Sequence, residues 1–307
     1  MSLSLVVLLA LAPIPGRAAG WQEAVFSVSD VARLEAFLVG VGGWRREATG
    51  TLAPAERELW RLPPGVGGRY VLLRAPDSPR GSVRLVQFDD AASLTPLRAE
   101  ARTWEPGGIG GLNVRIRSFE ALLPAFRRAG FQGHSAPVRF TLQEFTVIEA
   151  MLTDPDGITL TPLQRVAPPL EGWSLGDGLS RPFNAFEVVA DFGRAMRFYE
   201  DGLGFRSLRD EAGPLGPAGP NIFGLPWDEM PRVTRRLRWL HPDGAGASDG
   251  TLAVMAFDGA RGAQHARSAT PHALGIVALR LPVPDAAAAT DVGEGCRAAG
   301  MTAGRDP

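Results

Sequence analysis

Arginine, asparagine and glutamate alternate with apolar residues in several segments that are predicted to be strands. Successive side chains of a strand point to opposite faces, so the polar members of each segment share one face. The polar set that this alternation brings together is Glu23, Arg84, Asn113 and Arg115. Guanidinium groups bind carboxylates through two parallel hydrogen bonds. The pattern therefore predicts a small organic anion held by Arg84 and Arg115, with Glu23 as their partner or as a base.

A second interpretation of the same residues stays open at this point. Ionisable side chains rarely stay buried unless they are paired. Glu23 can pair with Arg84 or with Arg115. Such an ion pair would fill the hollow between the strands without binding a ligand.

Residue types that usually carry metal or nucleophile chemistry are scarce. The chain has one Cys, so no intramolecular disulfide can form. It has no Lys, which excludes a Schiff-base lysine and a phosphate-loop lysine. Of the four histidines, His272 is the best placed, two residues before the last predicted strand. We interpret all four as solvated or loop residues rather than metal ligands.

The charge balance also narrows the classes of partner. The formal net charge is −1 and the sequence pI is about 6.5. Neither a basic patch nor a stripe of alternating basic and aromatic residues is present, so we expect no nucleic-acid partner. A small-molecule ligand is the expected partner.

The strands and helices that must position these residues follow a repeated sequence pattern. The stretch "SVSDVARLEAFLVGVGGW", residues 27–44, begins as a strand, turns into a helix at Asp30 and ends on glycine. The same order recurs with Ser118, Asp191 and Asp285 as the capping residues. About three strands follow each helix except the last, after which the chain stops. Strand, helix and three strands are thus the repeated unit of an α+β fold.

Two of these phrases are specific. The sequence resembles the vicinal oxygen chelate superfamily in three features: the repeated unit, the stretch "VVADFGRAMRFYEDGLGF" at 188–205, and the stretch "DPDGITLTPLQ" at 154–164. That superfamily includes glyoxalase I, the bleomycin-resistance proteins and the extradiol dioxygenases. The resemblance covers residues 22–300. It implies βαβββ units paired into two open, cup-shaped domains, here with the last unit incomplete.

The resemblance also implies a division of the chain. We expect the first cup in residues 20–167, a linker in 168–182, and the second cup in 183–307. Pro and Gly cluster in the linker segment. Since the fourth unit lacks its last strands, the second cup would have an open sheet edge, which a homodimer could cover. A chain that is a fragment is the alternative.

Members of the superfamily that bind a metal ion hold it at two kinds of position. One lies seven residues before the helix cap, and the other lies in the last strand of a unit. The residues at these positions here are Glu23, Gly111, Asn184 and Ala278, and then Arg84, Thr161 and Ala253. Of these, Glu23 is a usual donor, whereas a divalent ion needs three or four converging donors. We therefore expect no metal and no cofactor.

The lack of metal-ligating residues at these positions favours a metal-free protein that binds a small anionic or aromatic molecule, with Asn184 as a further binding residue. The alternative is a metal-dependent lyase, isomerase or dioxygenase of the superfamily. In the same strand as Asn184, alternation places Glu187 on the helix side. Either the strand register slips there, or Glu187 pairs with an arginine such as Arg235, Arg236 or Arg238; we expect the ion pair. Tyr199 is predicted to lie in the core.

The first nineteen residues differ in composition from the rest. "LSLVVLLALAP" is an apolar run of the length of a signal-peptide core, and small residues precede a cleavage site after Ala18. Residues 1–19 are therefore predicted to be a signal peptide, which implies a periplasmic or secreted protein. A buried N-terminal segment in a cytoplasmic protein is the alternative. After signal removal we expect no membrane association, because no second long apolar run follows.

Overall fold

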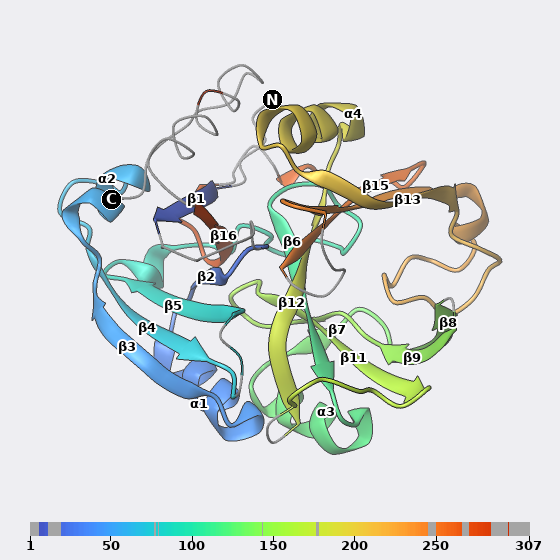
Figure 1. Ribbon diagram of the computed structural model, residues 1–307, viewed down its shortest axis with the longest axis horizontal. Helices are drawn as coiled ribbons and strands as arrows, with labels where there is room; N and C mark the ends of the chain where they lie inside the picture. The colour runs from blue at the N-terminus through green and yellow to red at the C-terminus, as the bar shows by residue number, and fades with distance from the viewer. Residues whose placement is uncertain are drawn as a thin grey trace.

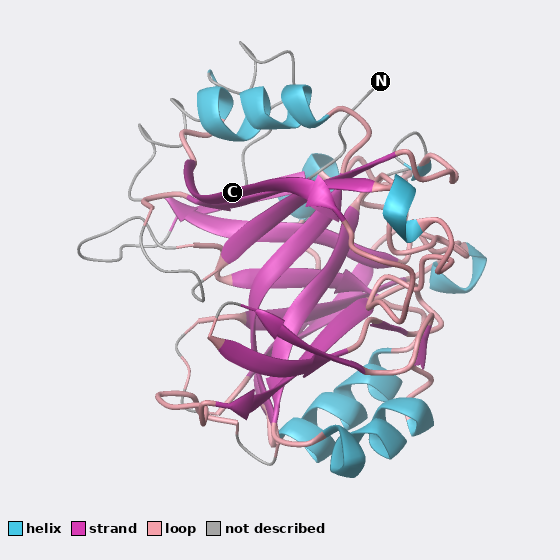
Figure 2. Ribbon diagram, turned by 90° about the vertical axis from the view of Figure 1, so that its right-hand side faces the viewer, coloured by secondary structure: helices cyan, strands magenta, loops and turns pink. Residues whose placement is uncertain are grey.

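The computed structural model describes residues 6–11, 20–76, 78, 80–142, 144–175, 178–244, 250–265, 270–283 and 294. Two curved, mixed β-sheets lie in the middle, and the longer helices lie on their outer sides (Figure 1, Figure 2). The helices are α1 (Val31–Gly42), α2 (Pro54–Leu59), α3 (Phe119–Arg128) and α4 (Phe192–Met196), with the short helical turns η1 (Ala91–Ser93), η2 (Arg197–Gly202) and η3 (Met230–Arg232).

Sixteen strands belong to the described part of the chain. The first half holds β1 (Val6–Leu11), β2 (Glu23–Ser27), β3 (Arg45–Thr51), β4 (Gly68–Arg74), β5 (Ser82–Phe88), β6 (Ile109–Ile116), β7 (Gln132–Gly133) and β8 (Val138–Leu142). The second half holds β9 (Phe145–Glu149), β10 (Leu152–Thr153), β11 (Thr159–Ala167), β12 (Leu179–Val188), β13 (Arg206–Pro214), β14 (Thr234–His241), β15 (Thr251–Asp258) and β16 (Gly275–Val283).

The predicted α+β fold of βαβββ units is confirmed. In each complete unit the first strand is followed by a helix, and it pairs in parallel with the last strand of the same unit. These pairs are β2 with β5, β6 with β11, and β12 with β15. In the second unit the β8–β9 hairpin extends the strands, and β9 also pairs with β11. The short helix α2, between β3 and β4, was not expected from the sequence.

The pairing of the units differs from the prediction. β6 pairs antiparallel with β12, and β2 pairs antiparallel with β16. The second and third units therefore share the ten-stranded sheet, whose main path is β13-β14-β15-β12-β6-β11-β10-β7. The first and fourth units share the six-stranded sheet, ordered β1-β16-β2-β5-β4-β3.

The expected division at a 168–182 linker fails for a simple reason. β12 already begins at Leu179, and it returns directly alongside β6. This occupies the free edge of the second unit, so the free edge of β2 is left for β16. Successive units along the chain therefore do not form the cups; the inner two and the outer two do.

The open edge expected at the fourth unit is covered in the described structure. β1 pairs with β16 in parallel, from Val6 opposite Ala278 to Leu11 opposite Val283. This is the place that the last strand takes in the other units. The predicted helix after Asp285 and the predicted cleavage after Ala18 lie outside the described residues. Export and a homodimer stay predictions.

The predicted helix caps at Asp30, Ser118 and Asp191 are confirmed. The Asp30 carboxylate accepts a hydrogen bond from the Ala32 N–H at 2.9 Å, and Asp191 accepts one from the Arg194 N–H at 2.9 Å. Both satisfy first-turn donors that have no partner inside the helix. Gly43 ends α1 with a φ of 65°, which a residue with a Cβ rarely adopts.

One large apolar core lies between the helices and the helix-facing sides of both sheets. Its fully buried members include Phe26, Leu34, Leu112, Phe126, Ala185 and Tyr199. The core position predicted for Tyr199 is confirmed. Each sheet therefore has one face in this shared core and one concave face turned away from it.

The expected ion pair of Glu187 is wrong. Glu187 is 3% exposed on the helix-facing side of β12, where the Tyr199 hydroxyl lies beside it. Burial raises the pKa of Glu187 to about 7, and the hydroxyl offsets part of that rise. The three arginines pair elsewhere, with Glu211, with Asp258, and with Glu200 and Asp210. The carboxyl of Glu187 thus lies beside a hydroxyl where a cation was expected.

An ion-pair cluster joins the first unit to the second. Arg33 on α1 reaches Asp154 and Asp156 in the turn before β11, each at 2.7 Å. The Ser29 hydroxyl donates to Asp156 at 2.6 Å. The two aspartate side chains are 0% and 2% exposed, so they depend on these partners.

Replacing Arg33 with Ala should lower the free energy of unfolding by about 3 kcal/mol, because it leaves two buried carboxylates without their cation. Chemical denaturation measures this. Arg46→Ala is the matched control. Arg46 also pairs with a carboxylate, that of Glu35 on α1, but the side chain of Arg46 is 57% exposed. The Arg46→Ala control should lower the free energy of unfolding by less than about 1 kcal/mol. Equal losses in both variants would contradict the assignment.

Candidate functional site

The structure divides the predicted site residues between two concave faces. Glu23 and Arg84 lie on the six-stranded sheet, whereas Asn113, Arg115 and Asn184 lie on the ten-stranded sheet. The expected single cluster therefore does not form. The cause is again the pairing of units, since β2 and β6 start different sheets.

On the six-stranded sheet the charges are already paired. Arg84 Nε donates to Glu23 Oε1 at 2.7 Å, and Arg280 donates to the same oxygen at 3.1 Å. A second nitrogen of Arg280 lies 3.4 Å from Glu56 on α2. The ion-pair interpretation thus describes Glu23 and Arg84. Side chains fill the rest of this face, among them Val25, Leu52, Trp60, Val86 and Phe88.

On the ten-stranded sheet a polar row crosses the four central strands. Its members stand opposite one another in register: Thr161, Asn113, Asn184 and Thr251. The amide of Asn184 lies 2.6 Å from that of Asn113 and 2.8 Å from the Thr251 hydroxyl. Asn113 and Asn184 therefore touch, and they form the floor of this concave face.

Glu149 is a floor residue that the sequence analysis missed. Its Oε1 lies 3.3 Å from the Asn113 amide nitrogen, and the residue is 8% exposed. Burial raises the pKa of Glu149 to about 7, against the attraction of Arg235, Asn113 and Arg115. Period-two alternation in 145–149 places Glu149 with Val147, and that signal was available in the sequence.

Arg115 is the unusual charge of the site. It is 8% exposed, and its guanidinium has no hydrogen bond or ion pair among the described residues. The rings of Trp173 and Phe183 each lie 4.7 Å from the guanidinium carbon. Burial and repulsion from Arg165 lower the pKa of Arg115 to about 10, against the attraction of Glu149.

Two more arginines make this part of the face positive. Arg165 follows two residues after Leu163, the β11 partner of Arg115, and stacks on Phe145 at 3.7 Å. Arg181 lies over Trp173 at 5.2 Å. Glu149 is the carboxylate that attracts Arg115 here. The arrangement suits an anion better than a cation, and a carboxylate could take both guanidinium hydrogen bonds.

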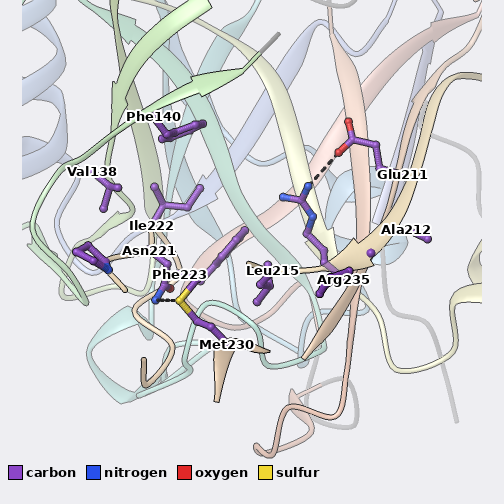
Figure 3. Close-up of a pocket in the computed structure, with 13 residues that line it drawn as sticks. Val138, Phe140, Glu211, Ala212, Leu215, Asn221, Ile222, Phe223, Met230 and Arg235 are labelled. Carbon is purple, nitrogen blue, oxygen red and sulfur yellow. Dashed lines mark hydrogen bonds and ion pairs between the residues drawn. The ribbon is translucent and has the colours of Figure 1, made fainter. Parts of the chain in front are cut away.

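A pocket of about 390 Å³ opens between two edges of the ten-stranded sheet (Figure 3). β8 supplies one wall, and β13 with the segment that follows it supplies the other. Arg235 lies in the wall and donates to Glu211 at 3.0 Å. The volume lies in the range of small-molecule sites.

The positions that hold metal ions in the superfamily have other contacts here. A Cβ at Gly111 would lie 2.6 Å from the ring of Phe186. Within the described ranges, His, Cys, Asp and Glu form no group of three that could hold a metal ion. His265 bonds Glu105 and His272 bonds Asp90, each at 3.0 Å, while His241 pairs with Asp243.

The described helices are all too short or too polar to cross a membrane.

Comparisons with known proteins give structural likenesses. No family model matches, and no curated protein matches. Glyoxalase I from Zea mays is 16% identical with a TM-score of 0.49, over 78% of this chain and 67% of that chain. A glyoxalase family protein from Bacillus cereus is 11% identical with a TM-score of 0.41, over 51% of this chain and 100% of that chain.

A third solved structure is a glyoxalase/bleomycin resistance protein/dioxygenase family enzyme from Burkholderia phytofirmans PsJN. It is 19% identical with a TM-score of 0.28, over 48% of this chain and 100% of that chain. All three belong to the group that the sequence resembles, and the likeness is one of fold. Fold alone does not assign a reaction.

The buried Glu149 should make stability depend on pH. Its folded pKa of about 7 lies above 4.5, the usual value for a glutamate, so its stabilising contribution is present below pH 4.5 and is lost as the pH rises through 7. Glu149→Gln removes this loss. Relative to the wild type, the variant should gain about 3 kcal/mol of unfolding free energy between pH 4.5 and pH 8.

Urea denaturation across this pH range tests the difference. Glu58→Gln, at an exposed glutamate, is the control and should follow the wild type at every pH. A constant offset between Glu149→Gln and wild type would show that Glu149 does not titrate in this range.

Proposed function

We propose that the concave face of the ten-stranded sheet binds a small organic anion with an aromatic or apolar body, without a divalent metal ion. The observation that carries this proposal is Arg115, a residue that is 8% exposed, has a buried Nε without a hydrogen-bond partner, and has no ion pair among the described residues. The fold resembles a group with small-molecule sites, which supports the proposal at the level of fold.

The energetics favour a bound anion at this place. Removing a charge from water is costly unless hydrogen bonds and an opposite charge replace the water. Glu149 supplies attraction but no hydrogen bond to Arg115, and its own burial favours the neutral form. A ligand carboxylate would supply both an opposite charge and hydrogen bonds to Arg115. The faces of Trp173 and Phe183 already lie against the guanidinium and hold it in place on that side.

The six-stranded sheet is the weaker candidate for the same function. Arg84 already shares Glu23 with Arg280, and a ligand carboxylate would have to displace that glutamate. Apolar side chains and α2 also occupy its concave face. Arg84 is therefore a natural control for Arg115.

A metal-dependent lyase, isomerase or dioxygenase is the second candidate function. The observation in its favour is the floor, where the Glu149 carboxyl lies beside the amides of Asn113 and Asn184. One carboxyl group and neutral amides form a poor donor set for a divalent ion. This candidate therefore ranks below the metal-free one.

Elemental analysis of the untagged protein separates the two functions. The metal-free proposal expects less than one-tenth of an equivalent of any transition metal after dialysis. Stoichiometric metal that disappears in Glu149→Gln but remains in Glu58→Gln would support the metal-dependent enzyme instead.

Anion binding is tested by thermal shift and calorimetry with a panel of aliphatic and aromatic carboxylates. Arg115→Gln should weaken binding at least tenfold, because a hydrogen bond to a charged group contributes about 1.5 to 3 kcal/mol. Arg84→Gln should leave the affinity unchanged. Without ligand, Arg115→Gln should be at least as stable as the wild type, since it removes a buried unpaired charge.

Equal affinity in wild type and Arg115→Gln would overturn the proposal. So would a loss of stability in ligand-free Arg115→Gln that matches its loss of binding, because that result would make Arg115 a structural residue.

A further inference from the structure

The pocket between β8 and β13 has apolar walls. Val138 and Phe140 of β8 face Leu215, Ile222 and Phe223 of the segment between β13 and β14 (Figure 3). Its charged lining residues, Arg235 and Glu211, are bonded to each other. The pocket therefore offers apolar surface and no unpaired charge, which suits the uncharged part of a ligand.

Strand register connects this pocket to the positive region. Phe140 stands opposite Val147, and Val147 stands opposite Arg165. Paired residues of adjacent strands share one face, and strands lie about 4.8 Å apart, so Phe140 and Arg165 are about 10 Å apart along the sheet. The pocket and the arginines thus belong to one continuous concave face.

The next row of paired residues on the sheet also connects the pocket to the arginines. Val138 stands opposite Glu149, Glu149 opposite Leu163, and Leu163 opposite Arg115. Phe140, Leu163 and Arg165 each remain partly exposed. Val147 and Glu149, which lie between them on β9, are buried, so Leu163 and Phe140 provide the exposed apolar surface that leads from the arginines toward the pocket.

We propose that the bound anion is an elongated amphipathic acid. Its carboxylate lies at Arg115 and Arg165, and its aliphatic or arylalkyl tail passes over Leu163 into the pocket between Phe140 and Ile222. This inference rests on the proposed function and adds the shape and polarity of the ligand. A short, compact acid would leave the pocket empty and its apolar walls in contact with water.

Straight-chain carboxylates from butanoate to decanoate, below their aggregation concentrations, test the tail. Calorimetry should show about a fourfold gain in affinity for each added methylene until the pocket is full. Octanol at the same concentrations should bind at least tenfold more weakly than octanoate, because it lacks the anionic group.

Two pocket variants locate the tail. Phe140→Ala and Ile222→Ala should weaken octanoate about tenfold and leave butanoate unchanged. Leu142→Ala, at a 37% exposed residue on the same strand as Phe140 but outside the pocket, should leave both acids unchanged. Circular dichroism of each variant checks that it is folded.

The following outcomes distinguish this inference from the proposed function on which it rests. Carboxylates that bind through Arg115 with one affinity at every chain length, unaffected by Phe140→Ala, would overturn the amphipathic acid and keep the anion site. Failure of every carboxylate to bind, or binding unaffected by Arg115→Gln, would overturn both.

Discussion

The antiparallel pairing of β6 with β12 is the constraint on which the rest of the site depends. It joins two units through their first strands and sets Asn113 opposite Asn184. Because one face of each strand packs on the helices, the opposite face carries Asn113, Arg115 and Asn184. Arg115 is thereby held on a sheet floor rather than on a loop, and its burial follows from the neighbouring strand that carries Phe183.

The two concave faces show how one fold treats buried charge in two ways. On the six-stranded sheet Glu23 satisfies two guanidinium groups, and apolar side chains close the hollow. On the ten-stranded sheet the opposing carboxyl, Glu149, is itself buried and titrates near neutrality, so it satisfies Arg115 poorly. The difference lies in a few side chains, since the strand order around the first strands is the same.

Local pattern predicted much of this fold and part of the site. Alternation assigned the faces of Glu23, Asn113 and Asn184 correctly, because a strand buries one face whatever its partner is. The pairing of units could not be read in the same way, since a free strand edge accepts any other edge. The prediction for Glu187 was wrong for a related reason: a buried carboxyl beside the Tyr199 hydroxyl leaves the same sequence pattern as an ion pair. Glu149 was within reach of the alternation argument.

The close contact of Gly111 and Phe186 limits what this site can become. Any side chain at 111 would collide with the aromatic ring that lies over it. Substituting a histidine or glutamate there would therefore require a second change that removes the ring, which is itself 3% exposed and part of the apolar filling of this face. An evolutionary route from this floor to a metal centre through that position thus passes through a destabilised intermediate, so a single mutation does not open it.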